Sequence, residues 1–218
     1  ALEKIDLLIV QDIFLSATAK LADVVLPGVS FAEKDGTFVN TERRVMRVRK
    51  AIEPVGESHQ DWKIIQDISN LFGYQMNYDS PEAIFKEIAE LTPSYAGITY
   101  ERLEGQGIQW PCPSLAHPGT PILHTDGNFA RGKGMFHAID YKPPAEVIDE
   151  EYPFWMTTGR VYAHYHTGTM TRRSKSLNFE VSQGFIEINP ADAKTFDVKD
   201  GHRIKINSRR GEIETRVK

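Results

Sequence analysis

Two short apolar runs near the N-terminus predict the first part of the fold. Leu7–Val10 is continuously apolar, which is typical of a strand covered on both faces, as in a parallel sheet. Ala22–Pro27 is a second such run, and its proline ends it. Ser16–Leu21 lies between them and predicts a short helix. A strand, a short helix and a strand in this order predict an α/β layer.

A strand and two amphipathic helices are expected next. Val45 and Val48 are interleaved with arginines, which allows a strand with alternating faces. Glu57–Phe72 has the clearest helical spacing, with Ser58 in position to cap it. Ser80-Pro81 opens a second helix, because proline is favoured in the first turn. Its apolar stripe is expected to consist of Ile84, Ile88 and Leu91.

The pattern changes twice after the second helix. Gly105–Pro144 is rich in proline and glycine with little periodicity, which predicts an extended connector lying on a surface. The chain after residue 150 favours strands, which indicates part of a small barrel. The elements expected there are a strand at Phe154–Met156, a strand at Phe185–Asn189, a helix from Pro190 to Phe196, and a hairpin of Arg203–Asn207 with Glu212–Val217. We therefore expect three parts: a first domain at residues 1–104, an extended connector at residues 105–150 and a second domain at residues 151–218.

Composition narrows the possible functions. The 218 residues carry a formal net charge of −4, which gives no global sign of nucleic acid or of a membrane surface as partner. No apolar run is long enough to span a membrane. Cys112 is the only cysteine, so the chain by itself holds neither a disulfide nor an iron–sulfur cluster, and a reducing, cytoplasmic compartment suits it. The first residues, Ala1–Lys4, read like a cut into a longer sequence.

The richest chemistry lies in Thr157–Ser174, TTGRVYAHYHTGTMTRRS. Two turns in it combine glycine, hydroxyl groups and arginine, the combination that a diphosphate needs, because glycine lets backbone N–H groups approach and arginine offers a fork of donors. A loop with solvated arginines explains the same residues equally well. His164 and His166 have the spacing of a metal pair on a strand, but no nearby cysteine or carboxylate completes a ligand set, so no metal site is expected.

This stretch closely resembles the part of molybdopterin-dependent formate dehydrogenases that meets the bis-molybdopterin guanine dinucleotide cofactor. Further segments resemble the same family in the same order: Gln11–Phe14, Ala22–Pro27, Glu33–Arg44 and Gln109–Pro113. The resemblance covers essentially the whole chain. It implies part of the α/β cofactor-binding domain for 1–104, and for 151–218 the N-terminal part of a double-psi (aspartate-decarboxylase-like) barrel that binds the dinucleotide.

The resemblance also assigns residues to the cofactor. Asp12 matches a carboxylate that meets a guanine, for which a carboxylate accepting from N1–H and the 2-amino group makes chemical sense, whereas a local helix cap is the alternative. The remaining matches to pterin and phosphate contacts are Thr158, Gly159, Arg160, His164, Tyr165, Thr169 and Arg172. Arg43 and Arg44 match a segment near the substrate funnel, where an arginine would steer formate, but a purely structural ion pair with Glu33 or Glu42 is slightly favoured. Cys112 matches the family's connector and is expected to be structural.

The family's reaction is the two-electron oxidation of formate to carbon dioxide at a molybdenum or tungsten centre. Its metal-ligating cysteine or selenocysteine, its histidine and its 4Fe–4S cluster motif have no match here, so no catalytic residue is assigned. The chain is expected to be a segment, to hold no cofactor and oxidise no formate alone, and to need the rest of the catalytic subunit and iron–sulfur electron-transfer subunits. The alternatives are a non-catalytic scaffold or assembly module, or a segment of a nitrate reductase or formylmethanofuran dehydrogenase.

Overall fold

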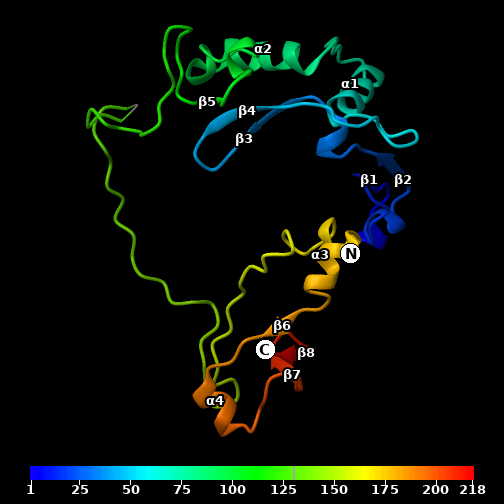
Figure 1. The fold of residues 1–218 in the computed structure, drawn as a ribbon, viewed down its shortest axis with the longest axis vertical. Helices are drawn as coiled ribbons and strands as arrows, with labels where there is room; N and C mark the ends of the chain where they lie inside the picture. Colours follow the sequence, from blue (N-terminus) through cyan, green and yellow to red (C-terminus); the bar gives the residue numbers. More distant parts are fainter. Residues whose placement is uncertain (130) are drawn as a thin grey trace. The chain divides into compact units, whose positions relative to one another are not determined.

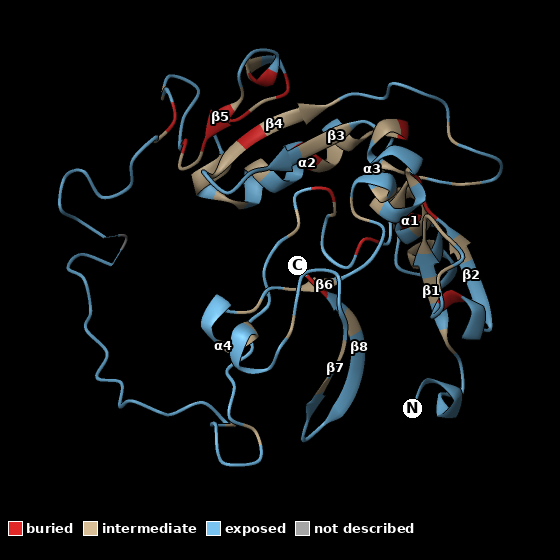
Figure 2. Cartoon of the chain, turned by 60° about the horizontal axis from the view of Figure 1, so that its bottom comes forward, coloured by how far each residue is buried: buried red, intermediate tan, exposed pale blue. Residues whose placement is uncertain are grey.

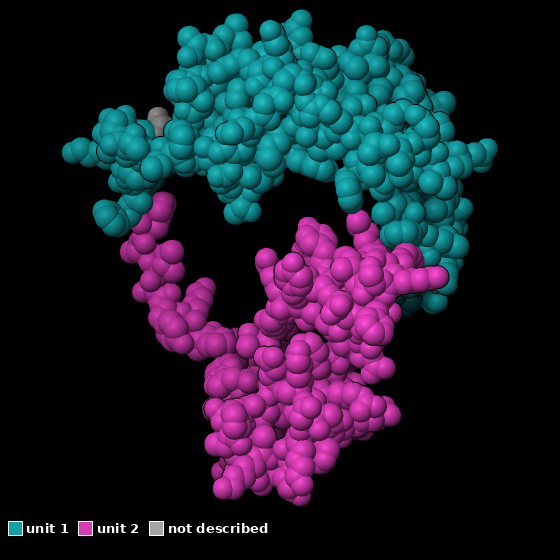
Figure 3. All heavy atoms as spheres, in the orientation of Figure 1, with its two compact units in different colours: residues 1–136 teal, residues 137–218 magenta. Residues whose placement is uncertain are grey.

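The computed structural model describes residues 1–129 and 131–218. The chain divides into two compact units, residues 1–136 and 137–218 (Figure 3). Each unit has sheets and helices of its own (Figure 1). No helix in the described part of the chain is long and apolar enough to cross a membrane.

The first two strands of unit 1 are β1 (Ile9–Asp12) and β2 (Val24–Pro27), which pair in parallel with Ile9 opposite Val24. The predicted connection between them is a single 3-10 turn, Ala19–Leu21. The expectation of a strand covered on both faces is wrong, since the side chains of Leu7 and Ile9 are half exposed. This sheet has only two strands, so much of their apolar surface remains open to solvent.

A second sheet of unit 1 is antiparallel. It contains β3 (Gly36–Val39), β4 (Arg44–Val48) and β5 (Ile108–Gln109), in the order β3-β4-β5. The predicted strand is confirmed as β4, but its burial does not alternate: Val45 is fully buried, and the other four residues, Val48 included, are half-buried.

Two helices complete unit 1, α1 (Asp61–Leu71) and α2 (Pro81–Leu91). The predicted start of α2 is confirmed: the Ala83 amide donates to Ser80 Oγ at 3.1 Å, and Pro81 occupies the first turn. The cap predicted for α1 is wrong, since the Ser58 hydroxyl donates to the Val55 carbonyl at 2.7 Å and the helix begins only after Gln60.

The apolar stripe of α2 is also shifted from its predicted position. Phe85 is the buried residue, while Ile88 and Leu91 are 44% and 75% exposed. The cause is aromatic packing, because the Phe85 ring contacts the rings of Tyr95 and Tyr100 at centroid distances of 6.3 and 5.7 Å. The core of unit 1 consists of Val45, Phe85, Ile98, Tyr100, Leu103, Ile108 and Cys112 (Figure 2).

The first part of the expected connector lies inside this core. Ile108–Gln109 is strand β5, and Cys112 is fully buried, which confirms a structural cysteine. Gly97 allows the close approach, since a side chain there would come within 2.0 Å of the Ser114 carbonyl oxygen. Proline and glycine removed the periodicity that would have indicated burial. Two 3-10 turns, Pro93–Tyr95 and Glu101–Leu103, lead the chain into this region.

Arg102 holds the buried loop in place. Its guanidinium donates to the carbonyl oxygens of Gly97 and His117, the latter at 2.7 Å, and lies 3.3 Å from Cys112 Sγ. The thiol in turn contacts the His117 carbonyl oxygen at 3.3 Å. One cation therefore satisfies carbonyl groups in a segment that has few backbone ladder partners.

Glu33 plays a similar part beside β3. It ends the 3-10 turn Phe31–Glu33 and is 6% exposed. Its carboxylate accepts from the Ser30 amide at 2.7 Å and from the Val55 amide at 2.8 Å. These hydrogen bonds, led by those from Ser30, outweigh desolvation and lower the pKa of the Glu33 carboxyl.

Unit 2 has one open sheet. Its strands are β6 (Phe185–Ile186), β7 (Arg203–Ser208) and β8 (Gly211–Val217), in the order β6-β8-β7, with β7 and β8 forming the predicted antiparallel hairpin. The described residues form no closed barrel. Its helices are α3 (Lys175–Glu180) and α4 (Pro190–Thr195), with a 3-10 turn at Thr171–Arg173.

One prediction in unit 2 is confirmed and one is wrong. The Asn189 side chain accepts from the Ala191 amide at 2.9 Å and caps α4 as expected. No strand forms at Phe154–Met156, whose side chains are more than half exposed. The apolar run there resembled a buried strand, but no neighbouring strand in the described chain pairs with it.

We predict that Glu33→Gln destabilises unit 1 at pH 7 and has little effect at low pH. The lowered pKa of Glu33 means that its stabilisation is present above the unfolded-state pKa, roughly 4.3, and is lost as the pH falls through the folded-state pKa. Urea unfolding at pH 7 and at pH 3 measures the difference. Glu53→Gln, at an 81% exposed side chain, is the control, and equal losses for both variants would contradict the assignment.

We predict that Arg102→Ala lowers the free energy of unfolding of unit 1 by roughly 2–4 kcal/mol, because it leaves buried carbonyl oxygens without donors. It also exposes Cys112 to thiol reagents under native conditions. Urea unfolding and thiol-labelling rates measure the two effects. Arg49→Ala removes a half-exposed arginine with one ion pair to Glu104 and is expected to change both values little.

Candidate functional site

Asp12 lies at the carboxyl end of β1, as predicted. Its Oδ1 atom accepts a hydrogen bond from the Phe14 amide at 3.1 Å, and its own carbonyl accepts from the Gly28 amide at 3.1 Å. The carboxylate therefore shapes a local turn, and it does not cap the next helical turn, whose N-cap is Thr18. It remains half exposed at the edge of the sheet, where ligands of open parallel sheets bind.

Asp61 joins this strand edge and was missed as a site residue. Gln11 Nε2 donates to Asp61 Oδ1 at 2.6 Å, and Lys34 Nζ pairs with Oδ2 at 2.8 Å. Burial acts to raise the pKa of the Asp61 carboxyl, but the hydrogen bonds from Lys34 and Gln11 outweigh it, so its pKa is lowered. Gly28 lies directly beside this group, since a Cβ there would come 3.2 Å from Asp61 Oδ1.

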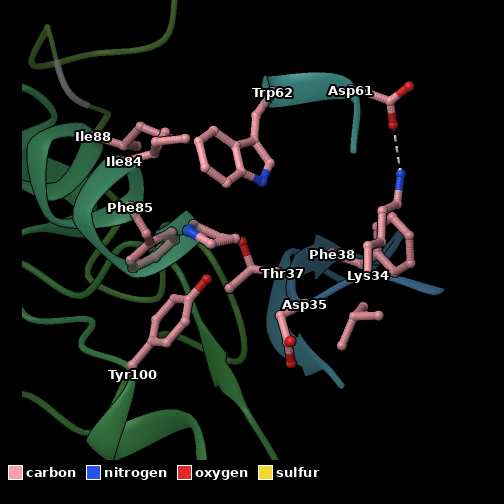
Figure 4. Close-up of a pocket in the computed structure, with 13 residues that line it drawn as sticks. Lys34, Asp35, Thr37, Phe38, Asp61, Trp62, Ile84, Phe85, Ile88 and Tyr100 are labelled. Carbon is pink, nitrogen blue, oxygen red and sulfur yellow. Dashed lines mark hydrogen bonds and ion pairs between the residues drawn. The ribbon is translucent and has the colours of Figure 1, made fainter. Parts of the chain in front are cut away.

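A cavity of about 250 Å³ lies beside the Lys34–Asp61 pair (Figure 4). Its walls come from β3, α1 and α2 and are mainly apolar, with Trp62 and Phe85 prominent. Tyr100 forms part of the wall, but its hydroxyl oxygen is covered and has no hydrogen-bond partner among the described residues. The cavity is therefore mainly apolar, with the charged side chains of Lys34, Asp35 and Asp61 in its lining.

Arg43 and Arg44, the residues predicted at a substrate funnel, make structural contacts. The Arg43 guanidinium donates to the carbonyl oxygens of Trp110, Thr120 and Pro121, the last two at 3.0–3.1 Å, and lies over the Trp110 indole. Arg44 pairs with Glu42 at 2.7 Å. Arg43 thus holds a loop through backbone oxygens, whereas the carboxylate pairing expected of an arginine here is made by Arg44.

The second half of Thr157–Ser174 forms a compact set of turns. The amides of His164, Gly168 and Arg172 donate to the carbonyls three or four residues before them. Gly168 has φ +81°, and a Cβ there would come 2.9 Å from Arg172 Cγ, so the turn requires glycine. Arg172 Nη1 reaches the Ser182 carbonyl oxygen at 3.1 Å.

Both nitrogens of the His164 ring are occupied within the chain. Nε2 lies 2.6 Å from the Val181 carbonyl oxygen and must donate to it, while Nδ1 lies 2.9 Å from Thr171 Oγ1. His164 therefore has no free ring nitrogen with which to bind a metal ion together with His166. The described residues also contain no group of three side chains able to hold a metal ion.

The first part of the stretch is different. Thr158, Gly159 and Arg160 are exposed and make no hydrogen bond or ion pair among the described residues. Gly159 is not in the left-handed conformation, and a Cβ there would meet no atom within 4 Å. No contact among the residues that the structure describes therefore explains this glycine or engages the arginine next to it.

The other predicted residues cluster near this free segment in sequence. Tyr165 is 70% exposed, and its ring meets the His166 ring edge-on at 4.3 Å. Thr169 is exposed, and its carbonyl accepts from Arg173 Nη1 at 2.5 Å. All the predicted residues from Thr158 to Arg172 lie in unit 2, whereas Asp12 lies in unit 1.

Comparison with family models gives two matches. Residues 1–71 match the model described as Molybdopterin oxidoreductase. Residues 154–218 match the model described as Molydopterin dinucleotide binding domain. The second match begins just before Thr158, so it contains the unpartnered segment and the compact turns after it.

Curated relatives match the whole length of the chain. The chain is 51% identical to the F420-dependent formate dehydrogenase 1 subunit alpha of Methanococcus maripaludis and 52% identical to the F420-dependent formate dehydrogenase subunit alpha of Methanocaldococcus jannaschii. A putative formate dehydrogenase of Staphylococcus aureus is 44% identical. The chain spans 33% of the length of the two archaeal relatives and 22% of the bacterial one.

Among solved structures, the acetylene hydratase of Pelobacter acetylenicus matches 98% of this chain and 31% of its own, with a TM-score of 0.64 and 17% identity. At that identity the likeness concerns the fold alone. The family matches at both ends and the relatives over the full length agree with the resemblance inferred from the residues. The chain belongs to the molybdopterin oxidoreductase family, and its close relatives are alpha subunits of formate dehydrogenases.

Proposed function

We propose that this chain is a cofactor-holding segment of a formate dehydrogenase alpha subunit. The observation that carries the proposal is the unpartnered Thr158-Gly159-Arg160 segment, whose glycine and arginine make no contact that explains them among the described residues. Its position inside the dinucleotide-binding family match gives these groups a ligand of suitable chemistry. The relatives that match the full chain are about three times as long, so the rest of the subunit supplies what this chain lacks.

The residues fit a molybdopterin guanine dinucleotide. The Arg160 guanidinium offers a fork of unpaired donors for phosphate oxygens, and the Thr158 hydroxyl and Gly159 amide offer further donors beside it. Asp12 keeps a half-exposed carboxylate able to accept from guanine N1–H and its amino group. We propose a pair of these dinucleotides carrying molybdenum or tungsten, which supplies the two-electron centre when bound.

The compact turns have a supporting role in this proposal. His164 uses both ring nitrogens to tie the stretch to Thr171 and Val181, and Arg172 ties it to Ser182. Tyr165 and Thr169 remain on the exposed side, where they can contact the cofactor. His164 and Arg172 therefore act on the cofactor mainly by holding the turns that present these neighbours.

Formate is the proposed substrate, and the partners are the remainder of the subunit together with iron–sulfur electron-transfer subunits. We propose that a 4Fe–4S cluster and the catalytic residues belong to the part of the subunit outside this chain. The dinucleotide-binding unit is proposed to complete its open sheet into a double-psi barrel. A cytoplasmic location is proposed because the single cysteine is buried and reduced.

We predict that Gly159→Ala, made in an alpha subunit that contains this chain, weakens cofactor retention about tenfold while leaving protein stability within roughly 0.5 kcal/mol. A Cβ at this position meets nothing in the chain, so only a ligand approaching the backbone would sense it. Metal and pterin content per polypeptide, together with urea unfolding of the cofactor-free protein, measures both effects.

Gly168→Ala is the matched control. Its φ of +81° and the contact with Arg172 predict a loss of about 1–3 kcal/mol in stability of the cofactor-free protein. Full retention of metal and pterin by Gly159→Ala would show that the segment does not hold the cofactor.

A further inference from the structure

Four charged side chains and a tyrosine connect two distant parts of unit 2. Arg209, in the β7–β8 turn, pairs with Glu146 at 3.0 Å and with Asp149, and its guanidinium lies over the Tyr152 ring at 4.4 Å. Arg210 adds a pair with Glu146 at 2.7 Å. Exposed single ion pairs contribute little to stability, but several charges joined in one network with a stacked ring contribute more than such pairs.

Asp149 joins the charged network to a hydrogen-bonded turn of the backbone. Its Oδ1 atom accepts from the amides of Glu151 and Tyr152 at 3.0 and 2.8 Å, and its amide donates to the Tyr152 carbonyl at 3.2 Å. The hydrogen bond from the Tyr152 amide, followed by the charge of Arg209, holds the pKa of Asp149 below its ordinary value. One oxygen therefore shapes the turn, while the other faces Arg209.

This turn lies directly before the segment proposed to grip the cofactor. After Tyr152, the edge contact between the rings of Phe154 and Phe196 is the last attachment, and both residues are more than half exposed. Residues 155–160 then make no hydrogen bond among the described residues, and the next attachment is the set of turns that starts at Val161. The Thr158–Arg160 segment is thus a span held at its two ends.

We propose that Arg209 is a positioning residue for cofactor binding: by fixing the turn at Glu146–Tyr152 it limits the positions open to Thr158–Arg160. The proposal rests on the proposed function of that segment. Arg209 itself contacts no cofactor, and its effect passes through the turn. The positive charge of Arg210, which is 75% exposed and makes one pair, has no comparable part.

The size of the effect follows from chain length. Residues 137–145 make no hydrogen bond among the described residues. Without Arg209, the remaining restraints between residues 145 and 155 are the Arg210–Glu146 pair, the local turn of Asp149 and the exposed Phe154–Phe196 ring contact. If these open as well, the loose span lengthens from residues 155–160 to residues 137–160. The effective concentration of a tethered group falls with roughly the 3/2 power of loop length. A fourfold longer span therefore sets an upper limit of roughly eightfold on the weakening of cofactor retention.

The experiment compares variants of an alpha subunit that contains this chain. Arg209→Ala, Asp149→Asn, Arg210→Ala and Arg160→Ala are assayed for metal and pterin content per polypeptide, for thermal midpoint without cofactor, and for kcat per bound metal. Asp149→Asn keeps the oxygen that shapes the turn and removes the charge that faces Arg209, so it tests the same link if Arg209→Ala fails to fold. The double variant Arg209→Ala/Asp149→Asn tests whether the two act as one unit.

The expected result is that Arg209→Ala and Asp149→Asn each lower cofactor retention up to about eightfold, with kcat per bound metal unchanged and the double variant no worse than Arg209→Ala. Arg210→Ala stays near the unmodified protein. This inference alone is overturned if Arg209→Ala and Asp149→Asn retain as much cofactor as Arg210→Ala while Arg160→Ala loses it. Unchanged retention by Arg160→Ala overturns the proposed function as well.

Discussion

The structure of unit 1 depends on supplying donors to backbone carbonyl groups in a segment too rich in proline to pair them in a sheet. Arg102 donates to the carbonyls of Gly97 and His117, and Arg43 donates to those of Trp110, Thr120 and Pro121. A buried carbonyl without a donor is costly, so these two cations allow residues 108–121 to pack in the core. The burial of residues 108–121 then places β5 beside β4 as the third strand of the β3-β4-β5 sheet.

Local signals in the sequence predicted those elements that depend on local chemistry. Ser80-Pro81 started a helix, Asn189 capped another, and the turn after Ser208 closed a hairpin, because each requires only neighbouring residues. The stripe of α2 could not be located from spacing, since the aromatic rings of Tyr95 and Tyr100 decide that Phe85 faces inward. The same holds for Phe154–Met156, because a strand needs a partner that sequence periodicity does not name.

The residues of the candidate site also fall into those that the sequence alone indicated and those that only long-range contacts could assign. Glycine, hydroxyl and arginine in Thr158–Arg160 indicated a phosphate grip from residue type alone, and the lack of partners there agrees with that chemistry. His164 could not be assigned from its type, because only folding brings Val181 and Thr171 to its two nitrogens. Arg43 and Asp61 were likewise decided by contacts at a distance of tens of residues, with Trp110 and Thr120 for the first and Gln11 for the second.

The pair β1–β2 has a practical consequence for handling the protein. Parallel strands are normally covered on both faces, yet Ile9, Val24 and Val25 of this two-stranded sheet are exposed. Each strand also has one edge without a ladder partner in the described chain, and such edges recruit further strands from other molecules. Purification of this chain by itself therefore favours self-association, and charged or proline substitutions on the β1 and β2 edges would improve its solubility.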